Sequence, residues 1–156
     1  AHFDDLKAML RSHQDATTIW AHTGLGRFVK PTENHLSLLK EILEDKDFEH
    51  VYFDLSWDEV AKYIVNDKQT VKAWAELIMA YPDRFLFGTD TVAPSTQEKY
   101  LGPYHEYQPL WCWLDGETAF QVKIGNYERI FDAANKKIRA WEKKSVAQQK
   151  KATSYP

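Results

Sequence analysis

The sequence predicts an α/β fold built around a small parallel sheet. Segments with helical apolar spacing alternate with short β-branched and aromatic runs, in the order helix, strand, helix, strand, helix, strand. Alternation of this kind implies parallel strands joined by right-handed crossovers. Three strands cannot close a barrel, which needs about eight strands and about 250 residues. The pattern therefore favours either a small open sheet or part of a (β/α) barrel.

The first half of the chain contains the expected helices and strands in turn. Apolar residues recur every three or four positions in four segments that we expect to be helical: residues 3–13, 31–45, 58–65 and 67–80. Ser56 or Asp58 is expected to cap the third helix, and Asp67 or Lys68 to begin the fourth. Runs rich in β-branched and aromatic residues predict three strands: residues 17–21, 51–55 and 84–89.

The chain has a different composition after the third strand. Residues 91–109 hold prolines, a glycine and several tyrosines without a regular period, and we expect an ordered lid there. Asp115 is expected to cap a short helix that ends near Val122, and Asn126 to cap a longer one that ends near Trp141. Four apolar residues of this last helix are expected to face inward: Ile130, Phe131, Ala134 and Ile138. Residues 1–142 would then be the folded part, and residues 143–156 a basic, solvated and frayed tail.

Composition excludes several kinds of partner. A formal charge of −3, from 20 Lys and Arg against 23 Asp and Glu, gives no electrostatic reason to expect nucleic acid or an anionic membrane. Cys112 is the only cysteine, so neither an intrachain disulfide nor a cysteine-based zinc site can form. These features favour the cytoplasm without deciding the location. Because the chain begins at Ala1, close to a helical pattern, we expect it to be the carboxyl-terminal part of a longer protein.

Two of the expected strands end on ionisable residues. Residues 85–90 form an apolar run that stops on Gly-Thr-Asp, and residues 17–24 form a similar run that ends on His22, Thr23 and Gly24. An aspartate is costly to bury as an anion, so Asp90 calls for a metal ion, a proton or a hydrogen-bond network. The carboxyl ends of parallel strands meet at one edge, and we therefore expect His22 and Asp90 to share a site there.

Other side chains are weaker candidates. Arg27 follows a glycine-bearing loop and could hold a substrate carboxylate through two hydrogen bonds, although a surface ion pair explains it as well. Ser56 is expected at the pocket rim, and His105 in the lid is a candidate substrate contact. Asp54 points away from its apolar neighbours, as a barrel-interior or loop-tethering acid would. His35 and His50 are expected to be surface or packing residues.

Four segments resemble a known family in order and spacing: Ile19–Gly24, Val51–Ser56, Tyr81–Asp90 and Ile124–Phe131. They are similar to the last third to half of the amidohydrolase-related TIM-barrel metal-dependent hydrolases. That branch also contains decarboxylases such as aminocarboxymuconate-semialdehyde decarboxylase. The resemblance implies that the three strands are the sixth, seventh and eighth of a (β/α)8 barrel, followed by its last helices.

The resemblance also implies roles for two residues, which lie 68 positions apart. His22 would match the histidine after strand six, which binds the metal or its water. Asp90 would match the aspartate after strand eight, a metal ligand or the acceptor of the water's proton. The metal would be divalent, with zinc expected. The His-x-His pair, the bridging residue and the further histidine of the family have no counterpart here, so this chain alone should be inactive.

Three functions remain open from the sequence. The first is hydrolysis, in which metal-activated water attacks a C–N bond, a C–O bond or a lactone. A decarboxylase of the same family and a non-catalytic α/β interaction module are the alternatives. The expected partner is a small-molecule substrate, with no nucleic acid and no membrane, and a homo-oligomer is left open.

Overall fold

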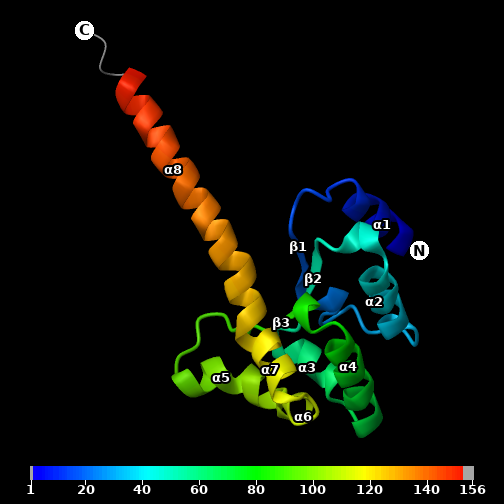
Figure 1. The fold of residues 1–156 in the computed structure, drawn as a ribbon. Coiled ribbons are helices and arrows are strands. Elements are labelled where there is room, and N and C mark those ends of the chain that lie inside the picture. The colour runs from blue at the N-terminus through cyan, green and yellow to red at the C-terminus, as the bar shows by residue number, and fades with distance from the viewer. Residues whose placement is uncertain (1, 153–156) are drawn as a thin grey trace.

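The computed structural model is an α/β body from which one long helix projects (Figure 1). It describes residues 2–152, with side chains as far as residue 146. No helix in that part is long and apolar enough to cross a membrane. The elements, in chain order, are α1 (Phe3–Arg11), β1 (Thr18–Trp20), η1 (Ala21–Gly24), α2 (His35–Glu44), η2 (Lys46–Phe48), β2 (Val51–Asp54), α3 (Asp58–Ile64), α4 (Lys68–Ala80), η3 (Pro82–Arg84), β3 (Phe85–Leu86), α5 (Gln97–Glu106), α6 (Gln108–Trp111), α7 (Gly116–Phe120), η4 (Gln121–Gly125), η5 (Glu128–Asp132) and α8 (Ala133–Ala152).

The three strands form one parallel sheet in the order β1-β2-β3, as the alternating pattern predicts. Register places Trp20, Phe53 and Phe85 in one row across the sheet, with ring centroids 5.9 and 5.5 Å apart. The third strand is shorter than the predicted residues 84–89. It ends early because the Phe87 amide donates to the carbonyl of Val122 rather than to a neighbouring strand.

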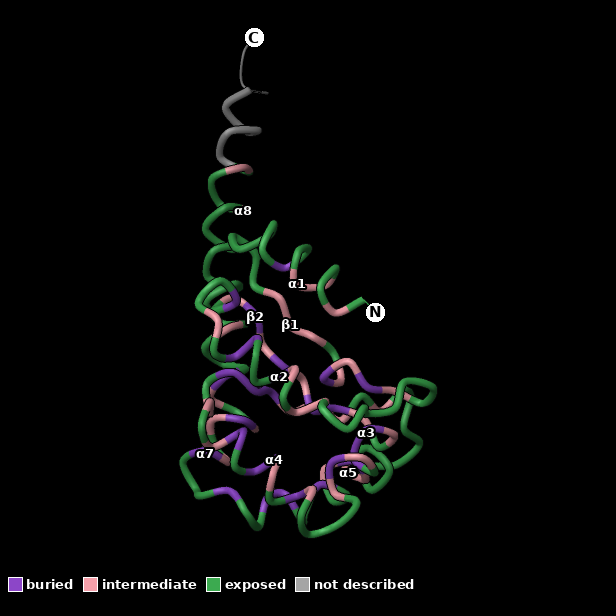
Figure 2. Tube along the Cα trace, turned by 90° about the vertical axis from the view of Figure 1, so that its right-hand side faces the viewer, coloured by how far each residue is buried: buried purple, intermediate pink, exposed green. Residues whose placement is uncertain are grey.

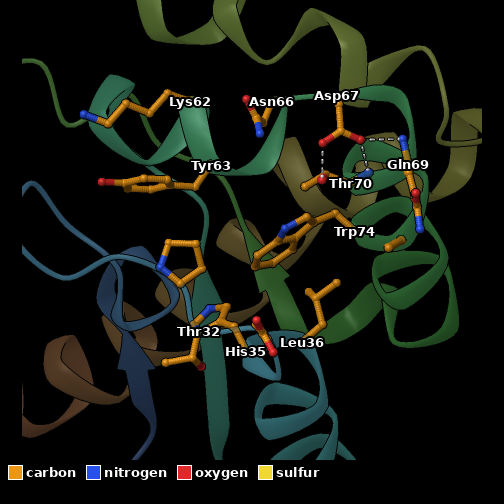
Figure 3. A pocket seen from close by; sticks show the side chains of 13 residues that line it. Thr32, His35, Leu36, Lys62, Tyr63, Asn66, Asp67, Gln69, Thr70 and Trp74 are labelled. Atoms are coloured by element: carbon orange, nitrogen blue, oxygen red, sulfur yellow. Dashed lines mark hydrogen bonds between the residues drawn. The ribbon is translucent and has the colours of Figure 1, made fainter.

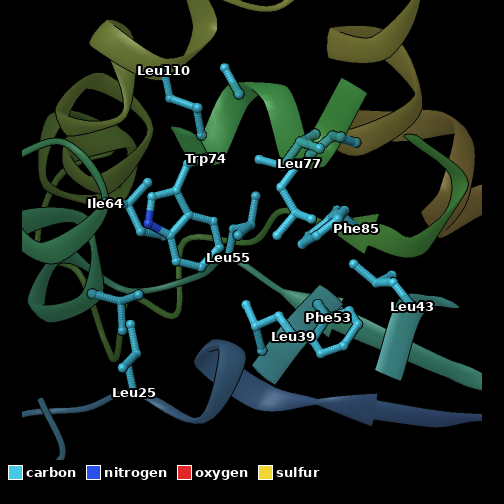
Figure 4. Close-up of a cluster of buried hydrophobic side chains, with 14 of the residues drawn as sticks. Leu25, Leu39, Leu43, Phe53, Leu55, Ile64, Trp74, Leu77, Phe85 and Leu110 are labelled. Atoms are coloured by element: carbon cyan, nitrogen blue, oxygen red, sulfur yellow. The ribbon is translucent and has the colours of Figure 1, made fainter. Parts of the chain in front are cut away.

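The core lies between the sheet and the helices (Figure 4). Leu39 of α2, Trp74 and Leu77 of α4 and Ile64 of α3 pack with Phe53 of the sheet. The buried segments gather in the body, whereas α8 is largely exposed (Figure 2). Within β2 the side chains alternate between buried and half-buried. The helices therefore cover one face of β2 and leave the other only partly covered.

The amino-terminal edge of the sheet is fastened by buried polar side chains. The Arg84 guanidinium donates to the carbonyls of Phe48 and Val51. Asn126, which is fully buried, donates its amide to the carbonyls of Pro82 and Phe85 at 2.7 and 2.8 Å. The predicted role of Asn126 as a helix cap was wrong, because its side chain donates to two buried carbonyls and the helical turns run through it.

The expected lid, residues 91–109, is mostly helical. The lack of a regular apolar period predicted no helix in this segment, and that prediction was wrong. Thr96 caps α5 by accepting from the Lys99 amide, and a second helix, α6, begins at Gln108. Pro103 lies inside α5 and costs a helical hydrogen bond. Aromatic packing offsets that cost, because Phe87 lies edge-on to Tyr107 at 5.3 Å. Tertiary contacts therefore decided the conformation of this segment.

The predicted starts of α4 and α7 are confirmed, whereas the predicted cap of α3 is wrong. Asp67 accepts from the amides of Gln69 and Thr70, and Asp115 accepts from that of Thr118. Neither Ser56 nor Asp58 caps α3. Trp57 holds that position, because the Ser56 hydroxyl donates to Asp54 instead.

The last helix does not pack inward as expected. Phe131 is 43% exposed and Ile138 is 55% exposed, while Ala134 is exposed and Ile130 half-buried. Helix α8 continues past the expected boundary at residue 143 as far as Ala152. Of the expected tail, residues 153–156 lie outside the described part of the chain. The apolar residues of this segment therefore face solvent along a projecting helix.

Candidate active site

The carboxyl-terminal ends of the three strands bring together an imidazole, a hydroxyl and two carboxylates. His22 lies in η1, directly after β1. Asp54 is the last residue of β2, Ser56 follows it by two, and Asp90 lies four residues after β3. The sequence predicts this convergence of His22, Ser56 and Asp90, since parallel strands deliver their following loops to one edge.

His22 is held on one ring nitrogen and open on the other. Its Nδ1 lies 3.0 Å from Ser56 Oγ and 3.5 Å from Asp54 Oδ2. Its Nε2 lies 3.7 Å from Asp90 Oδ2. The backbone amide of His22 also donates to Asp54 Oδ2 at 3.2 Å. Asp54 therefore positions both the main chain and the ring of His22.

The hydrogen bonds specify which nitrogen of neutral His22 carries the proton. The Ser56 hydroxyl donates to Asp54 Oδ2, and the Ser56 amide donates to Asp54 Oδ1 at 3.1 Å. Since its own proton is committed, Ser56 Oγ must accept from the Nδ1–H of His22. The Nε2 lone pair then points at the Asp90 carboxylate. Two electron-rich atoms facing one another require a cation, a proton or a water molecule between them.

This arrangement is not a serine nucleophile site. In a Ser-His-Asp triad the hydroxyl and the carboxylate lie on opposite nitrogens of the imidazole, so that the ring can relay a proton. Here Ser56 and Asp54 both lie on the Nδ1 side of His22. The ring cannot move a proton from Ser56 to a base beyond it. Ser56 is therefore a positioning residue.

Backbone strain concentrates at the same edge. His22 and Thr23 follow β1 at φ 57° and 53°, Trp57 follows β2 at φ 85°, and Asp90 follows β3 at φ 50°. Left-handed conformations of residues other than glycine are uncommon, and for a β-branched residue such as Thr23 they are outliers. Each costs on the order of 1–3 kcal/mol and persists only where its surroundings enforce it. Residues of this kind cluster at functional sites, and here one or more follow every strand of the sheet.

One buried tyrosine supports the strained turn after β2. The Tyr107 hydroxyl lies 3.5 Å from the carbonyl of Trp57, and the ring is fully buried. Burial raises the pKa of Tyr107 well above its ordinary value, so the hydroxyl keeps its proton and can donate. Trp57 in turn packs against the imidazole of His22, with ring centroids 5.1 Å apart. Helix α6 is therefore coupled to the site through Tyr107 and Trp57.

The other predicted candidates lie further out. Arg27 is 61% exposed, lies 3.6 Å from Glu59, and has its guanidinium 5.9 Å from the centre of the Trp57 ring. Arg27 therefore lies at the rim of the site. Its contact with Glu59 is the surface ion pair that the sequence analysis gave as the alternative to substrate binding. His105 is exposed on α5 and packs edge-on against Tyr104, without a recorded contact to the four residues of the site.

Sequence reasoning did not place Asp54 in the site. It identified Asp54 only as an interior or loop-tethering acid, although the structure makes it the hub of the hydrogen bonds around His22. A signal was present in the alternation of β2, where Asp54 is the last residue on the half-buried face. Its partners come from residues 32 positions earlier and 2 positions later, which no local pattern connects.

A pocket lies elsewhere, between the start of α2 and the start of α4 (Figure 3). Its volume is about 700 Å³, and Tyr63, Trp74 and His35 are among its lining residues. None of His22, Asp54, Ser56 and Asp90 lines it. The candidate site is thus an open edge of the sheet rather than this pocket.

His35 in that pocket should make stability depend on pH. Its Nε2 is buried without a hydrogen-bond partner, and burial lowers the pKa of His35 below its ordinary value of 6.5. The unfolded chain therefore takes up this proton at a higher pH than the folded chain does. The stability is complete above about pH 6.5 and falls as the pH drops below it.

Chemical unfolding at about pH 7.5 and about pH 5.5 measures this effect. The loss of stability between the two values should be smaller in His35→Gln than in the unsubstituted chain. His13→Gln, at an exposed position, is the matched control and should behave like the unsubstituted chain. An equal loss of stability in all three proteins would contradict the prediction.

The fold and the site define a class of protein. A small parallel sheet presents an imidazole and carboxylates at its carboxyl edge, which is where α/β enzymes place their active sites. A family model described as amidohydrolase matches residues 2–119. The chain belongs to the amidohydrolase family.

The family membership supports hydrolase-type chemistry and a TIM-barrel ancestry for the α/β body. No curated protein and no solved structure matches the chain. The match includes His22, Asp54, Ser56 and Asp90 but ends before the segment Ile124–Phe131. That last part of the resemblance therefore stays a prediction.

Members of this family usually bind divalent metals, which take nitrogen and oxygen ligands from side chains. Among the described residues, no group of three or more His, Cys, Asp or Glu side chains could hold a metal ion. The separation of 3.7 Å between His22 Nε2 and Asp90 Oδ2 is shorter than about 4.1 Å, the sum of two zinc–ligand bonds. One ion can contact both atoms. Within the described part of the chain, this pair could supply at most two ligands, fewer than the three that a catalytic zinc normally takes from protein.

Proposed function

We propose that this chain is the carboxyl-terminal part of a TIM-barrel hydrolase, in which His22 and Asp90 bind a divalent metal and carry proton transfer. The observation that carries the proposal is the 3.7 Å pairing of His22 Nε2 with Asp90 Oδ2, while Asp54 and Ser56 hold the other ring nitrogen. A metal-binding histidine ordinarily donates its second nitrogen to a carboxylate or an equivalent acceptor in this way.

Two observations support the assignment of the strands to a barrel. The sheet has three parallel strands, fewer than the eight that close a barrel. Tyr52 and Asp54 lie on the face of β2 that the helices cover only partly, as residues facing a barrel interior would. Under this proposal the remaining metal ligands come from strands outside the sequence described here.

Each residue of the site has a defined task in the proposed reaction. A divalent ion held by His22 and Asp90 would lower the pKa of bound water to about 7 and would polarise the scissile carbonyl. Asp90 accepts the proton of the attacking water and can return it to the leaving nitrogen or oxygen. His22 keeps Nε2 directed at Asp90 because Asp54 and Ser56 hold Nδ1. The bond broken is a C–N or C–O bond of an amide, ester or lactone.

The specificity of the site would come from its rim. Arg27 lies beside Trp57, which contacts His22. A guanidinium in this position can bind a substrate carboxylate through two hydrogen bonds once it leaves Glu59. The proposed substrate is therefore a small carboxylic acid that carries a hydrolysable bond.

Metal analysis of the complete polypeptide containing this chain tests the proposal. His22→Ala and Asp90→Ala should both lower the zinc bound per chain and lower the hydrolysis of a panel of aryl esters, lactones and anilides. His13→Ala and Asp15→Ala are matched controls at exposed positions and should change neither quantity. Full metal content together with full turnover in both site variants would overturn the proposal and favour a non-catalytic module.

A further inference from the structure

Asp90 lies beyond the end of the sheet. Strand β3 ends at Leu86, whose carbonyl accepts from the amide of Leu55 at 2.9 Å. The next amide, that of Phe87, donates to the carbonyl of Val122, and Asp90 follows three residues later at φ 50°. A left-handed conformation of this kind persists only where the surroundings enforce it. Contacts other than the hydrogen bonds between strands must therefore set the position of the Asp90 carboxylate.

Three aromatic side chains surround Phe87. They come from residues 97–111, which comprise α5 and α6 and which we call the α5–α6 segment. All three lie edge-on to its ring, with centroid distances of 5.0 Å for Trp111, 5.3 Å for Tyr107 and 6.0 Å for Tyr104. Edge-on contact is a preferred geometry for aromatic pairs. The α5–α6 segment therefore determines the path of the chain where it leaves β3.

The three aromatic rings are fixed by one another and by a lysine. Tyr104 and Tyr107 stack on Trp111, with ring centroids 6.1 and 5.7 Å from its own. The indole N–H of Trp111 donates to the carbonyl of Tyr104 at 3.1 Å. Lys123 Nζ lies 4.5 Å from the centre of the Trp111 ring and donates to the Tyr104 hydroxyl at 3.2 Å. Phe87 therefore packs against a cluster whose own geometry is well defined.

The same segment also contacts the chain after Asp90. The Thr91 hydroxyl donates to the carbonyl of Tyr100 in α5 at 3.3 Å. Asp90 thus lies between two contacts with the α5–α6 segment, one made by Phe87 and one made by Thr91.

Tyr107 connects this arrangement to His22. The Tyr107 ring is fully buried and packs on Phe87, while its hydroxyl lies 3.5 Å from the carbonyl of Trp57. Trp57 in turn packs on the His22 imidazole. One side chain therefore contacts both stretches of chain that bring His22 and Asp90 together.

We propose that Phe87 and Tyr107 are positioning residues that together set the separation between His22 Nε2 and Asp90 Oδ2. Loss of the aromatic contacts of Phe87 lets the Asp90 carboxylate move, whereas loss of the Tyr107 hydroxyl acts on His22 through Trp57. The consequence for metal binding rests on the proposed function, but the positions of the two side chains do not. An aromatic cluster that only stabilised the fold would leave the His22–Asp90 pair unchanged.

Nitrogen NMR of the complete polypeptide, metal-free and labelled in histidine, tests the role of Phe87. Asp90→Asn removes the charge beside His22 Nε2 and gives a reference shift for that nitrogen. Phe87→Leu should move the His22 Nε2 signal toward this reference. Phe48→Leu is the matched control, because Phe48 is fully buried near the opposite edge of the sheet and should leave the signal in place. An unmoved signal in Phe87→Leu, or an equal movement in Phe48→Leu, would overturn the proposal.

Proton NMR of the His22 ring tests the role of Tyr107. The Trp57 ring current displaces the signals of the imidazole protons, because the two ring centroids are 5.1 Å apart. Tyr107→Phe keeps the aromatic ring and removes only the hydroxyl, and it should change this displacement. Tyr81→Phe makes the same chemical change at a half-buried position after α4 and should not. The same displacement in Tyr107→Phe as in the unsubstituted protein would contradict the assignment of Tyr107.

The zinc affinity of the complete polypeptide shows whether the positioning matters for the reaction. Phe87→Leu and Tyr107→Phe should each weaken zinc binding about tenfold, at the lower end of the range for residues that support metal ligands. Phe48→Leu should lower the stability to unfolding without changing the affinity for zinc. Unchanged affinity in both positioning variants would overturn the proposal. If the unsubstituted polypeptide binds no zinc, the hydrolase proposal fails, and the two NMR experiments still decide whether Phe87 and Tyr107 position the pair.

Discussion

Replacing Asn126 by aspartate should destabilise the folded chain by about 1–3 kcal/mol, the range for buried polar groups left without their hydrogen bonds. The Asn126 amide donates to the carbonyls of Pro82 and Phe85, and its Oδ1 accepts from Arg129 at 3.1 Å. An aspartate would place a carboxylate oxygen against two carbonyl oxygens in a site without solvent access. Since these carbonyls flank β3, the loss would reach the strand that leads to Asp90.

Urea unfolding followed by tryptophan fluorescence measures this change. Asn135→Asp makes the same chemical change at an exposed position of α8 and should alter the stability by less than about 0.5 kcal/mol. Equal stability of Asn126→Asp and Asn135→Asp would show that the two buried hydrogen bonds do not hold this edge of the sheet.

Removing the carboxylate of Asp54 should release the ring of His22. Asp54 accepts from the amides of His22 and Ser56 and from the Ser56 hydroxyl. In Asp54→Ala the Ser56 hydroxyl becomes free to donate, so it can no longer specify Nδ1–H as the protonated nitrogen. Loss of such a supporting carboxylate typically costs 10–100-fold in metal affinity or activity. The three lost hydrogen bonds should also cost about 2–4 kcal/mol of stability.

Nitrogen NMR of the His22 imidazole tests whether Asp54 selects the protonated ring nitrogen or only stabilises the fold. The Nδ1–H tautomer should dominate in the unsubstituted chain and become mixed with Nε2–H in Asp54→Ala. Ser56→Ala should keep Nδ1–H, because Asp54 Oδ2 is already 3.5 Å from that nitrogen and can accept directly. Asp58→Ala, on the exposed first turn of α3, is the control. An unchanged tautomer in Asp54→Ala would remove Asp54 from the site.

Asn126 and Asp54 lie at opposite edges of the same sheet. Asn126 and Arg84 fasten the amino-terminal edge with donors to main-chain carbonyls, whereas Asp54 gathers donors at the carboxyl edge. Residues at the amino-terminal edge of barrel strands serve stability, and those at the carboxyl edge serve catalysis. A substitution at Asn126 should thus lower stability, while one at Asp54 should change the chemistry of His22 as well.

The backbone strain at the three strand ends explains why the two edges of the sheet have different roles. His22, Thr23, Trp57 and Asp90 all adopt positive φ, at an energetic cost that packing elsewhere must offset. That packing comes from the helices on one face of the sheet and from the aromatic row of Trp20, Phe53 and Phe85. The packed α/β body thereby stabilises the strained carboxyl-terminal edge of the sheet.

The sequence by itself determined the elements whose information is local. Apolar residues at intervals of three or four predicted α1 to α4, and Asp67 and Asp115 predicted their own helix starts. The order of these elements specified a parallel sheet, and therefore the edge where His22, Ser56 and Asp90 converge. Each of these features depends on neighbours in the chain or on the handedness of crossovers.

Only the tertiary structure decided the features that depend on distant partners. Asp54 acts on His22 from 32 residues away, Asn126 finds its carbonyls 41 and 44 residues earlier, and aromatic packing on Phe87 makes α5 and α6 helical despite Pro103. The exposure of Phe131 and Ile138 is of the same kind, since an apolar period predicts which residues share a face but not what covers it. The period of apolar residues predicts which side chains of an element share a face, whereas burial and hydrogen-bond partners depend on how the whole chain packs.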